Sequence, residues 1–321
     1  MKRFFRAICG AVALLAALSA QAAYPEKTVR VIVAFPPGGA SDIIARLLAK
    51  ELQAALGQPF IVENRGGGAG MLGTDLVAKS KPDGYTILMT PSAPVASGLA
   101  ILKQVPYDPV RDFTPVSRLA TSDIVLVASP KFAPQTFQEF VAAARANPDS
   151  VSAELNSLGS IHHLLTELMR VRIGAKLLLV PYKGTGPAII DLVGGHVQVG
   201  FESVVSVIDH LKAKRLRALA VATDQRLAAL PDTPTLKELG YPDLVAMPWW
   251  ALVAPAGTPK EAIDTLSTAW GKISKDPKVR EQFASQGMVA DWMSPADTAK
   301  FFKSEVERWA AVVKETGAKS E

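Results

Sequence analysis

The stretch from Val29 to Asp42, VRVIVAFPPGGASD, constrains this chain more than any other. An apolar, β-branched strand runs into a Pro-Pro-Gly-Gly turn, and a helix begins directly behind the turn. The N–H groups at such a junction are free and the helix dipole points the same way, which favours a bound anion. Adjacent Gly38 and Gly39 allow close backbone approach. We therefore expect a carboxylate or phosphate here, with Ser41 or Asp42 as the helix N-cap.

The first 22 residues have the features of a secretion signal. Three basic residues within the first six positions precede an apolar run, and Ala20-Gln21-Ala22 fits a signal peptidase site. The run is shorter than the roughly 20 residues of a spanning helix, so we expect export to the periplasm and no membrane insertion of the mature chain. The single cysteine, Cys9, lies inside this signal, which leaves the mature chain without a thiol.

The net charge and the length further restrict the class of protein to which this chain can belong. The formal charge is +5, and subtracting the three cations of the signal leaves +2 for the mature protein. Such a charge is not typical of a nucleic-acid-binding protein. About 300 residues remain after cleavage, enough for two lobes, each with its own core.

Strand-like and helix-like stretches alternate, which predicts an α/β protein. The expected strands are 29–35, 60–63, 85–90, 113–119, 124–128, 177–180, 197–201, 216–223 and 248–255. The expected helices are 43–56, 74–79, 137–146, 162–171, 187–193 and 204–213, followed by two helical stretches at 260–286 and 295–316. Chain crossings near residues 120 and 249 predict lobe 1 from 23–120 and 249–321, and lobe 2 from 121–248. Ligand sites in such sheets form at the carboxyl ends of strands, here in a hinged cleft.

Seven motifs, in order along the mature chain, carry a family resemblance. They occupy residues 23–42, 57–70, 81–88, 106–117, 180–201, 216–223 and 252–261. With them the chain resembles the substrate-binding proteins of tripartite tricarboxylate transporters, the Bug-type periplasmic receptors. The resemblance implies a type II periplasmic binding fold, in which two lobes joined by two crossing strands close on an organic acid. It also implies that the closed form docks on large and small inner-membrane transporter subunits. We expect the protein to be a monomer without a cofactor.

The resemblance implies that loop backbone at two helix N-termini, one per lobe, holds the ligand carboxylate. The first loop contributes Phe35, Pro37, Gly38, Gly39, Ala40, Ser41 and Asp42, and the second contributes Asn156, Ser157, Gly159, Ser160 and His163. Further candidates follow other strands: Thr90, Ser92, Tyr182, Lys183, Glu202 and Ser203.

The second loop departs from the family pattern, because Glu154, Leu155 and Ser157 stand where Gly, Ser and Gly are usual. If Glu154 faces the cleft, it would repel a second ligand carboxylate or favour an amino group. Otherwise it would be an ordinary solvated surface acid.

Other motifs allow different readings. Gly68 to Gly73 spells G-x-G-x-x-G, but the acid expected ~20 residues later is missing, which argues against a dinucleotide site. His162 and His163 are adjacent, whereas zinc helices use i, i+4 pairs, so no metal site is expected and His163 should support the loop base. Trp249-Trp250 could stack on an aromatic acid or pack in the core.

No nucleophile elbow or metal-ligand spacing indicates catalysis, and no catalytic residues are expected. Two alternatives stay open. One is a ligand sensor that presents its closed form to a membrane sensor kinase, and the other is a periplasmic enzyme on the same fold.

Overall fold

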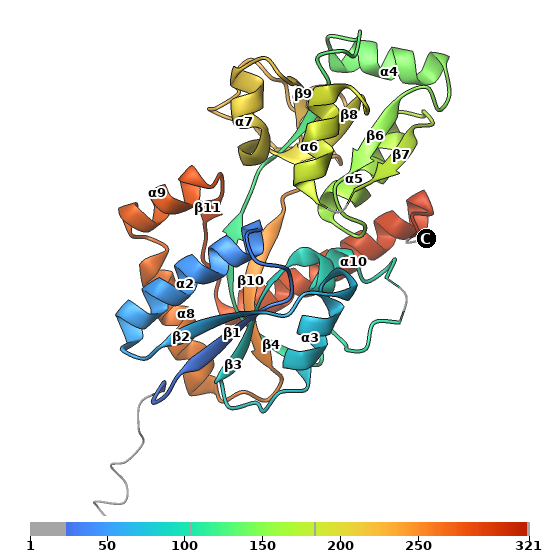
Figure 1. The fold of residues 1–321 in the computed structure, drawn as a ribbon. Coiled ribbons are helices and arrows are strands. Elements are labelled where there is room, and N and C mark those ends of the chain that lie inside the picture. The colour runs from blue at the N-terminus through green and yellow to red at the C-terminus, as the bar shows by residue number, and fades with distance from the viewer. Residues whose placement is uncertain (1–23, 103, 183, 320–321) are drawn as a thin grey trace, which may run out of the picture.

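The computed structural model describes residues 24–319 except 103 and 183 and shows two α/β lobes, one above the other (Figure 1). The predicted signal, residues 1–22, lies outside the described residues. Each lobe is built on its own mixed sheet. The expected fold, two α/β lobes with two crossing strands, is confirmed.

Lobe 1 contains a six-stranded sheet of order β11-β4-β10-β3-β1-β2. Its strands are β1 (Val29–Val33), β2 (Phe60–Asn64), β3 (Thr86–Pro91), β4 (Phe113–Thr121), β10 (Trp249–Pro255) and β11 (Val289–Ala290), and its helices are α2 (Ala40–Leu56), α3 (Met71–Ala78), α8 (Lys260–Ile273), α9 (Pro277–Ser285), α10 (Pro295–Thr316), η1 (Gly68–Gly70) and η2 (Ala93–Ser97). β1 is parallel to β2 and β3 and is buried on both faces. Val31 and Val33 pack with α2 and α8, whereas Ile32 packs on the side of α3 and α10.

Lobe 2 contains a five-stranded sheet of order β7-β6-β8-β5-β9. Its strands are β5 (Ile124–Ala128), β6 (Ser152–Leu155), β7 (Leu178–Pro181), β8 (Val199–Ser203) and β9 (Arg217–Val221), and its helices are α4 (Phe137–Ala146), α5 (Ile161–Arg172), α6 (Thr185–Gly194) and α7 (Val204–Lys212). β6 is parallel to β7 and β8, so the loops after these strands open at one edge.

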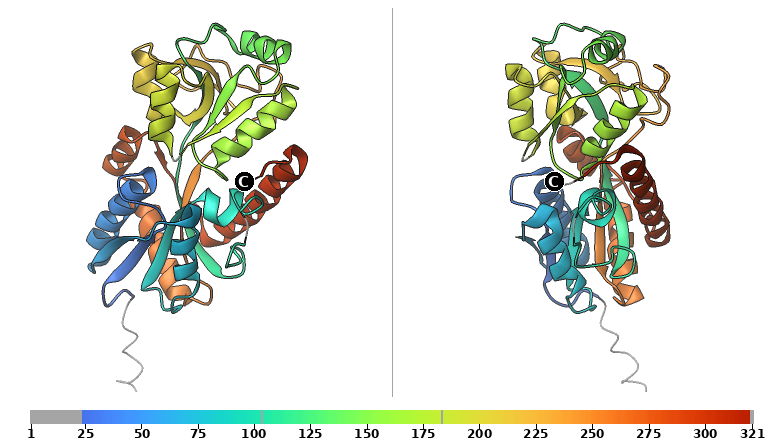
Figure 2. Two further views of the ribbon diagram at one scale, coloured as in Figure 1. Left: turned by 45° about the vertical axis from the view of Figure 1, so that its right-hand side comes forward. Right: turned by 90° about the vertical axis from the view of Figure 1, so that its right-hand side faces the viewer.

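Two strands carry the chain between the lobes. β4 continues through Ser122 and Asp123 into β5, and the chain returns into β10 beside it. The N–H of Ser122 donates to the Pro248 carbonyl at 3.0 Å, and Thr121 pairs with Trp249. The C-terminal helix α10 also contacts lobe 2 (Figure 2). Arg172 of α5 forms a salt bridge there with Glu315 of α10.

The structure corrects two expectations about elements. The stretch 260–286 is two helices, because Pro277 begins α9 and the Asp276 side chain caps it by accepting from the Lys278 N–H at 2.8 Å. Residues 152–155, taken only as part of a loop, form the strand β6.

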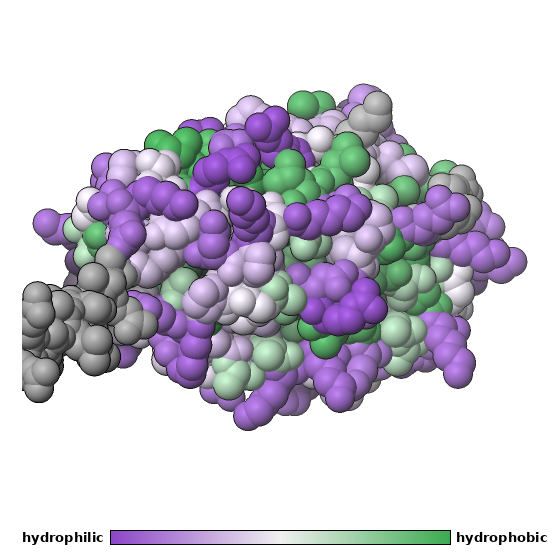
Figure 3. Space-filling model, turned by 90° about the horizontal axis from the view of Figure 1, so that it is seen from below, coloured by the Kyte–Doolittle hydropathy of each residue, from purple (hydrophilic) through white to green (hydrophobic). Residues whose placement is uncertain are grey.

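The surface adds two observations. In the described part of the chain, no helix is both long and apolar enough to cross a bilayer. The underside of lobe 1 is covered mostly by hydrophilic side chains, with smaller apolar areas between them (Figure 3).

Candidate functional site

Three loops of lobe 1 meet at the carboxyl ends of β1, β2 and β3. The Asn64 amide donates to the Phe35 carbonyl at 3.1 Å. A Cβ added to Gly70 would lie 2.8 Å from Pro94 and 2.9 Å from the Phe35 ring. The loops after all three strands therefore form one surface, where the sequence predicts a binding site.

The first loop presents the N-terminus of α2. The N-cap is Gly39, without a side-chain hydrogen bond, so the expectation of Ser41 or Asp42 as the cap is wrong. The first helical bond runs from the Ile43 N–H to the Gly39 carbonyl at 3.1 Å. The N–H groups of the three residues before Ile43 have no helical acceptor, and residues 36–40 are exposed. This arrangement suits a carboxylate.

Asp42 holds this loop instead of capping the helix. Its carboxylate accepts the Gly38 N–H at 3.0 Å, the Asn64 amide at 3.0 Å and the Arg46 guanidinium at 3.0 Å. Burial opposes ionisation, but the hydrogen bonds from Arg46, Gly38 and Asn64 outweigh it and lower the pKa of Asp42. An ionised Asp42 therefore occupies the Gly38 N–H and fixes the turn that exposes the next donors.

Replacing Asp42 with alanine is expected to lower the free energy of unfolding by about 2 kcal/mol, because three donors lose a charged acceptor. Urea unfolding followed by tryptophan fluorescence measures the change. Asp42→Asn keeps one acceptor oxygen and should lose less. Equal stability of Asp42→Ala and the unaltered protein would contradict this role.

A crossing strand supports the same helix N-terminus. The Trp250 indole donates to the Ser41 hydroxyl at 3.1 Å, and Trp250 is only 8% exposed. Trp249 is buried, donates to Glu305 at 2.8 Å and packs on Phe302. Both tryptophans therefore pack within the protein, and Trp250 links the hinge region to the first loop.

The second loop, in lobe 2, ends at the N-terminus of α5. Ser160 is the N-cap, and its hydroxyl accepts the His163 N–H at 3.1 Å and donates to Asn156 at 3.1 Å. The Gly159 N–H donates to Nδ1 of the buried His163 at 3.0 Å, which places the ring proton on Nε2. The expected support of the loop base by His163 is thus confirmed, and the Gly159 N–H is already used.

The loops of the two lobes touch. The Ser97 hydroxyl, in η2 of lobe 1, donates to the Gly159 carbonyl at 2.9 Å. A Cβ added to Gly159 would lie 3.1 Å from the Gly98 Cα, and Gly159 has a left-handed φ of +78°. A side chain at this position would separate the lobes, so glycine is required by both the contact and the backbone.

The remaining predicted site residues differ in their burial and in their hydrogen-bond partners. Thr90 and Ser92 are buried, the first donating to the Pro91 carbonyl at 3.0 Å. The Tyr182 hydroxyl donates to Asp191 of α6 at 2.7 Å, and the Ser203 hydroxyl lies 3.4 Å from Nε2 of His162. Lys183 lies outside the described residues.

Glu154 and Glu202 are both buried, at 1% and 0% exposure. The idea that Glu154 is a solvated surface acid is therefore wrong. A Cβ added to Gly200 would lie 2.3 Å from Oε1 of Glu154, which shows that this carboxyl occupies the space left by the glycine. Glu202 accepts from Thr185 at 3.2 Å and from Asn156 at 3.4 Å. Burial and the charge of Glu202 raise the pKa of Glu154, and burial raises the pKa of Glu202 to about 8.

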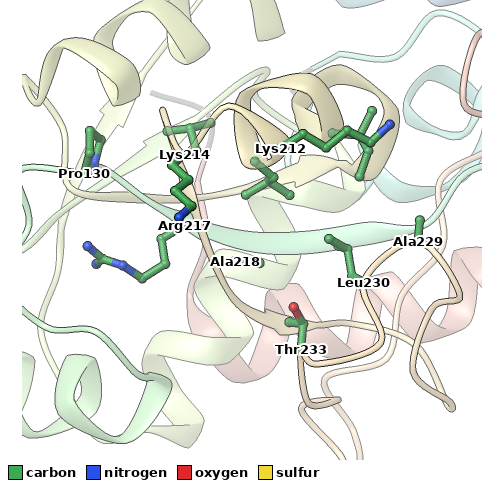
Figure 4. A pocket seen from close by; sticks show the side chains of 11 residues that line it. Pro130, Lys212, Lys214, Arg217, Ala218, Ala229, Leu230 and Thr233 are labelled. Carbon is green, nitrogen blue, oxygen red and sulfur yellow. The ribbon is translucent and has the colours of Figure 1, made fainter.

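A pocket of about 520 Å³ lies elsewhere in lobe 2, around α7 and β9 (Figure 4). Its lining is Pro130, Ile208, Leu211, Lys212, Lys214, Leu216, Arg217, Ala218, Ala229, Leu230 and Thr233. None of these is a predicted site residue. Within the described ranges, no group of three or more His, Cys, Asp or Glu side chains could hold a metal ion.

Several residues of the site were not predicted from the sequence. Asn64 joins the first loop to Asp42, Ser97 joins the lobes, and Thr185 donates to Glu202. Thr185 lies inside a family motif that could have drawn attention to it. Nothing in the sequence distinguishes Ser97, because its role depends on how the lobes meet.

Comparisons with known proteins point to one family. The sequence model of the tripartite tricarboxylate transporter family receptor matches residues 44–318. Protein BugT of Bordetella pertussis is 44% identical over 297 residues, which covers 92% of this chain and 91% of BugT.

Solved structures agree with this match. A protein of R. palustris determined with adipate has a TM-score of 0.84 and 31% identity, covering 92% of this chain and 98% of its own. MatC of Rhodopseudomonas palustris, with bound malate, has a TM-score of 0.80 and 30% identity, covering 90% and 100%. Periplasmic binding protein BugD has a TM-score of 0.81 and 31% identity, covering 93% and 100%.

Proposed function

Because the chain belongs to the tripartite tricarboxylate transporter receptor family, as a solute-binding protein, we propose that it captures a small carboxylate between its two lobes. The observation that carries the proposal is the α2 N-terminus, whose first N–H groups have no helical acceptor and lie beside the loops after β2 and β3. An anion there is stabilised by hydrogen bonds and by the helix dipole. Two relatives of similar fold hold the dicarboxylates adipate and malate.

The two lobes share the work in this proposal. Residues 23–120 and 249–321 form lobe 1, which supplies the α2 N-terminus, and residues 121–248 form lobe 2, which supplies the α5 N-terminus and Ser160. Closure about the two crossing strands removes the carboxylate from water and strengthens its hydrogen bonds. The residues predicted for the two loops stay candidates for ligand contact.

The same proposal places the mature chain in the periplasm after removal of residues 1–22. Its closed form then delivers the acid to the membrane subunits of a tripartite transporter. The family to which the chain belongs is named for that role. The protein acts by reversible capture and release and carries out no catalysis.

Thermal unfolding with a panel of mono-, di- and tricarboxylates tests the proposal. An acid present at about 100 times its Kd should raise Tm by about 5 °C. Inorganic phosphate serves as the control anion and should give a smaller shift. The absence of a shift with every carboxylate would overturn the proposed function.

A further inference from the structure

The lobe-2 side of the site contains two carboxyl groups that have no charge partner. Glu154 on β6 and Glu202 on β8 lie on the same face of the sheet, because Ala153 is paired with Val199 and each glutamate follows by an odd number of positions. In the described part of the chain, neither makes an ion pair. Both oxygens of Glu154 and Oε1 of Glu202 are buried without a hydrogen-bond partner there.

The surroundings of the pair contain no compensating cation among the described residues. β5 places Val125 beside Glu202, and α6 supplies the Thr185 hydroxyl. Tyr182, after β7, is already bonded to the carboxylate of Asp191 on α6. His162 of α5 lies near Ser203, but burial lowers its pKa to about 4, so it is uncharged at neutral pH. A buried carboxyl in such a place keeps its proton.

The pair is connected to the proposed ligand loop. Glu202 accepts from Asn156, and Asn156 accepts from Ser160, which caps α5. A carboxylate at the α5 N-terminus would therefore lie within a few side chains of Glu202. Its binding is easier when the pair is neutral, since each ionised carboxyl repels it.

We propose that Glu154 and Glu202 form a buried carboxyl pair whose protonation determines which ligand charge this receptor accepts. With the protons bound, the site takes an anion; when the pair ionises, the anion is repelled and released. This inference rests on the proposed function, because it concerns the charge of the captured acid. It also explains why a binding lobe has two buried acids on neighbouring strands, which destabilise the lobe when they are ionised.

Calorimetric titration of malate and adipate between about pH 6 and pH 9.5 tests the pair, since both acids stay ionised across this range. The affinity of the unaltered protein should fall roughly tenfold or more, as expected for a unit charge about 7–10 Å away at an effective dielectric constant of about 20. Glu202→Gln should remove most of this fall. Glu307→Gln makes the same change on the exposed face of α10, and the affinity of this variant should fall with pH as in the unaltered protein.

Aspartate separates charge from shape, because it carries an ammonium where malate has a hydroxyl. At pH values where this ammonium keeps its proton, the affinity for aspartate should fall less than the affinity for malate as the pH rises. Affinities that do not change with pH in the unaltered protein would overturn the carboxyl pair and leave the receptor function intact.

Carboxyl NMR titration of the ligand-free protein gives a readout that does not need a ligand. The signals of Glu154 and Glu202 are assigned by their absence from the matching Glu→Gln variants. Both signals should show a protonated carboxyl group at neutral pH. If no acid binds at any pH, the proposed function fails. If both glutamates titrate near their ordinary value of about 4.3, the pair itself is refuted.

Discussion

A Gly39→Val receptor is expected to fold normally and to bind carboxylates roughly 100-fold more weakly. This loss of affinity corresponds to two charge-assisted hydrogen bonds, which contribute about 1.5 kcal/mol each. Gly39 has φ −87° and ψ 172°, extended backbone that valine adopts readily. A Cβ at this position meets no atom within 4 Å. The side chain would therefore leave the core unchanged and would occupy the open space at the start of α2, where we propose that the carboxylate binds.

Calorimetry with malate or adipate measures this loss, and Tm of the ligand-free variant reports its fold. Ala54→Val places the same side chain at the exposed far end of α2, and this variant should bind normally. Gly38 is a poorer test, because its φ of +88° would strain any other residue. Affinity within about threefold of the unaltered protein would show that the acid is held elsewhere.

The fold and the first loop could be predicted because their signals are local. A strand, two prolines, two glycines and a helical pattern follow one another within 28 residues, and the structure places them as β1 and α2. The break between α8 and α9 was missed, although Asp276 and Pro277 carry a local signal for it. Apolar residues recur at helical spacing on both sides of this break, so the pattern was interpreted as one continuous helix.

The second loop could not be predicted in the same way, because its donors are assigned by tertiary contacts. From the sequence, the Gly159 N–H is expected to be free to bind a ligand. In the fold, the side chain of His163, four residues later, accepts a hydrogen bond from it. Likewise, the burial of Glu154 depends on Gly200, which is 46 positions away and lies next to it only once β6 and β8 pair. Pattern alone cannot place either partner.

The same pairing of strands predicts an unusual dependence of stability on pH. In the unfolded chain Glu202 ionises near pH 4.5, whereas in the folded protein burial raises its pKa to about 8. The folded state thus binds more protons between these values, and the free energy of unfolding must fall as the pH rises through this window. The contribution of the neutral Glu202 is complete below about pH 4.5 and is lost by about pH 8.

Glu202→Gln removes this proton linkage and should therefore become more stable than the unaltered protein as the pH rises from about 5 to about 8, by a few kcal/mol at the upper end. Urea unfolding at several pH values measures the difference. A buried amide has its own cost, which is independent of pH, so the slope of the difference against pH is the decisive quantity. The exposed Glu307→Gln variant should run parallel to the unaltered protein. Parallel curves for Glu202→Gln as well would mean that Glu202 is ionised inside the folded protein, and a cation would then have to lie against it.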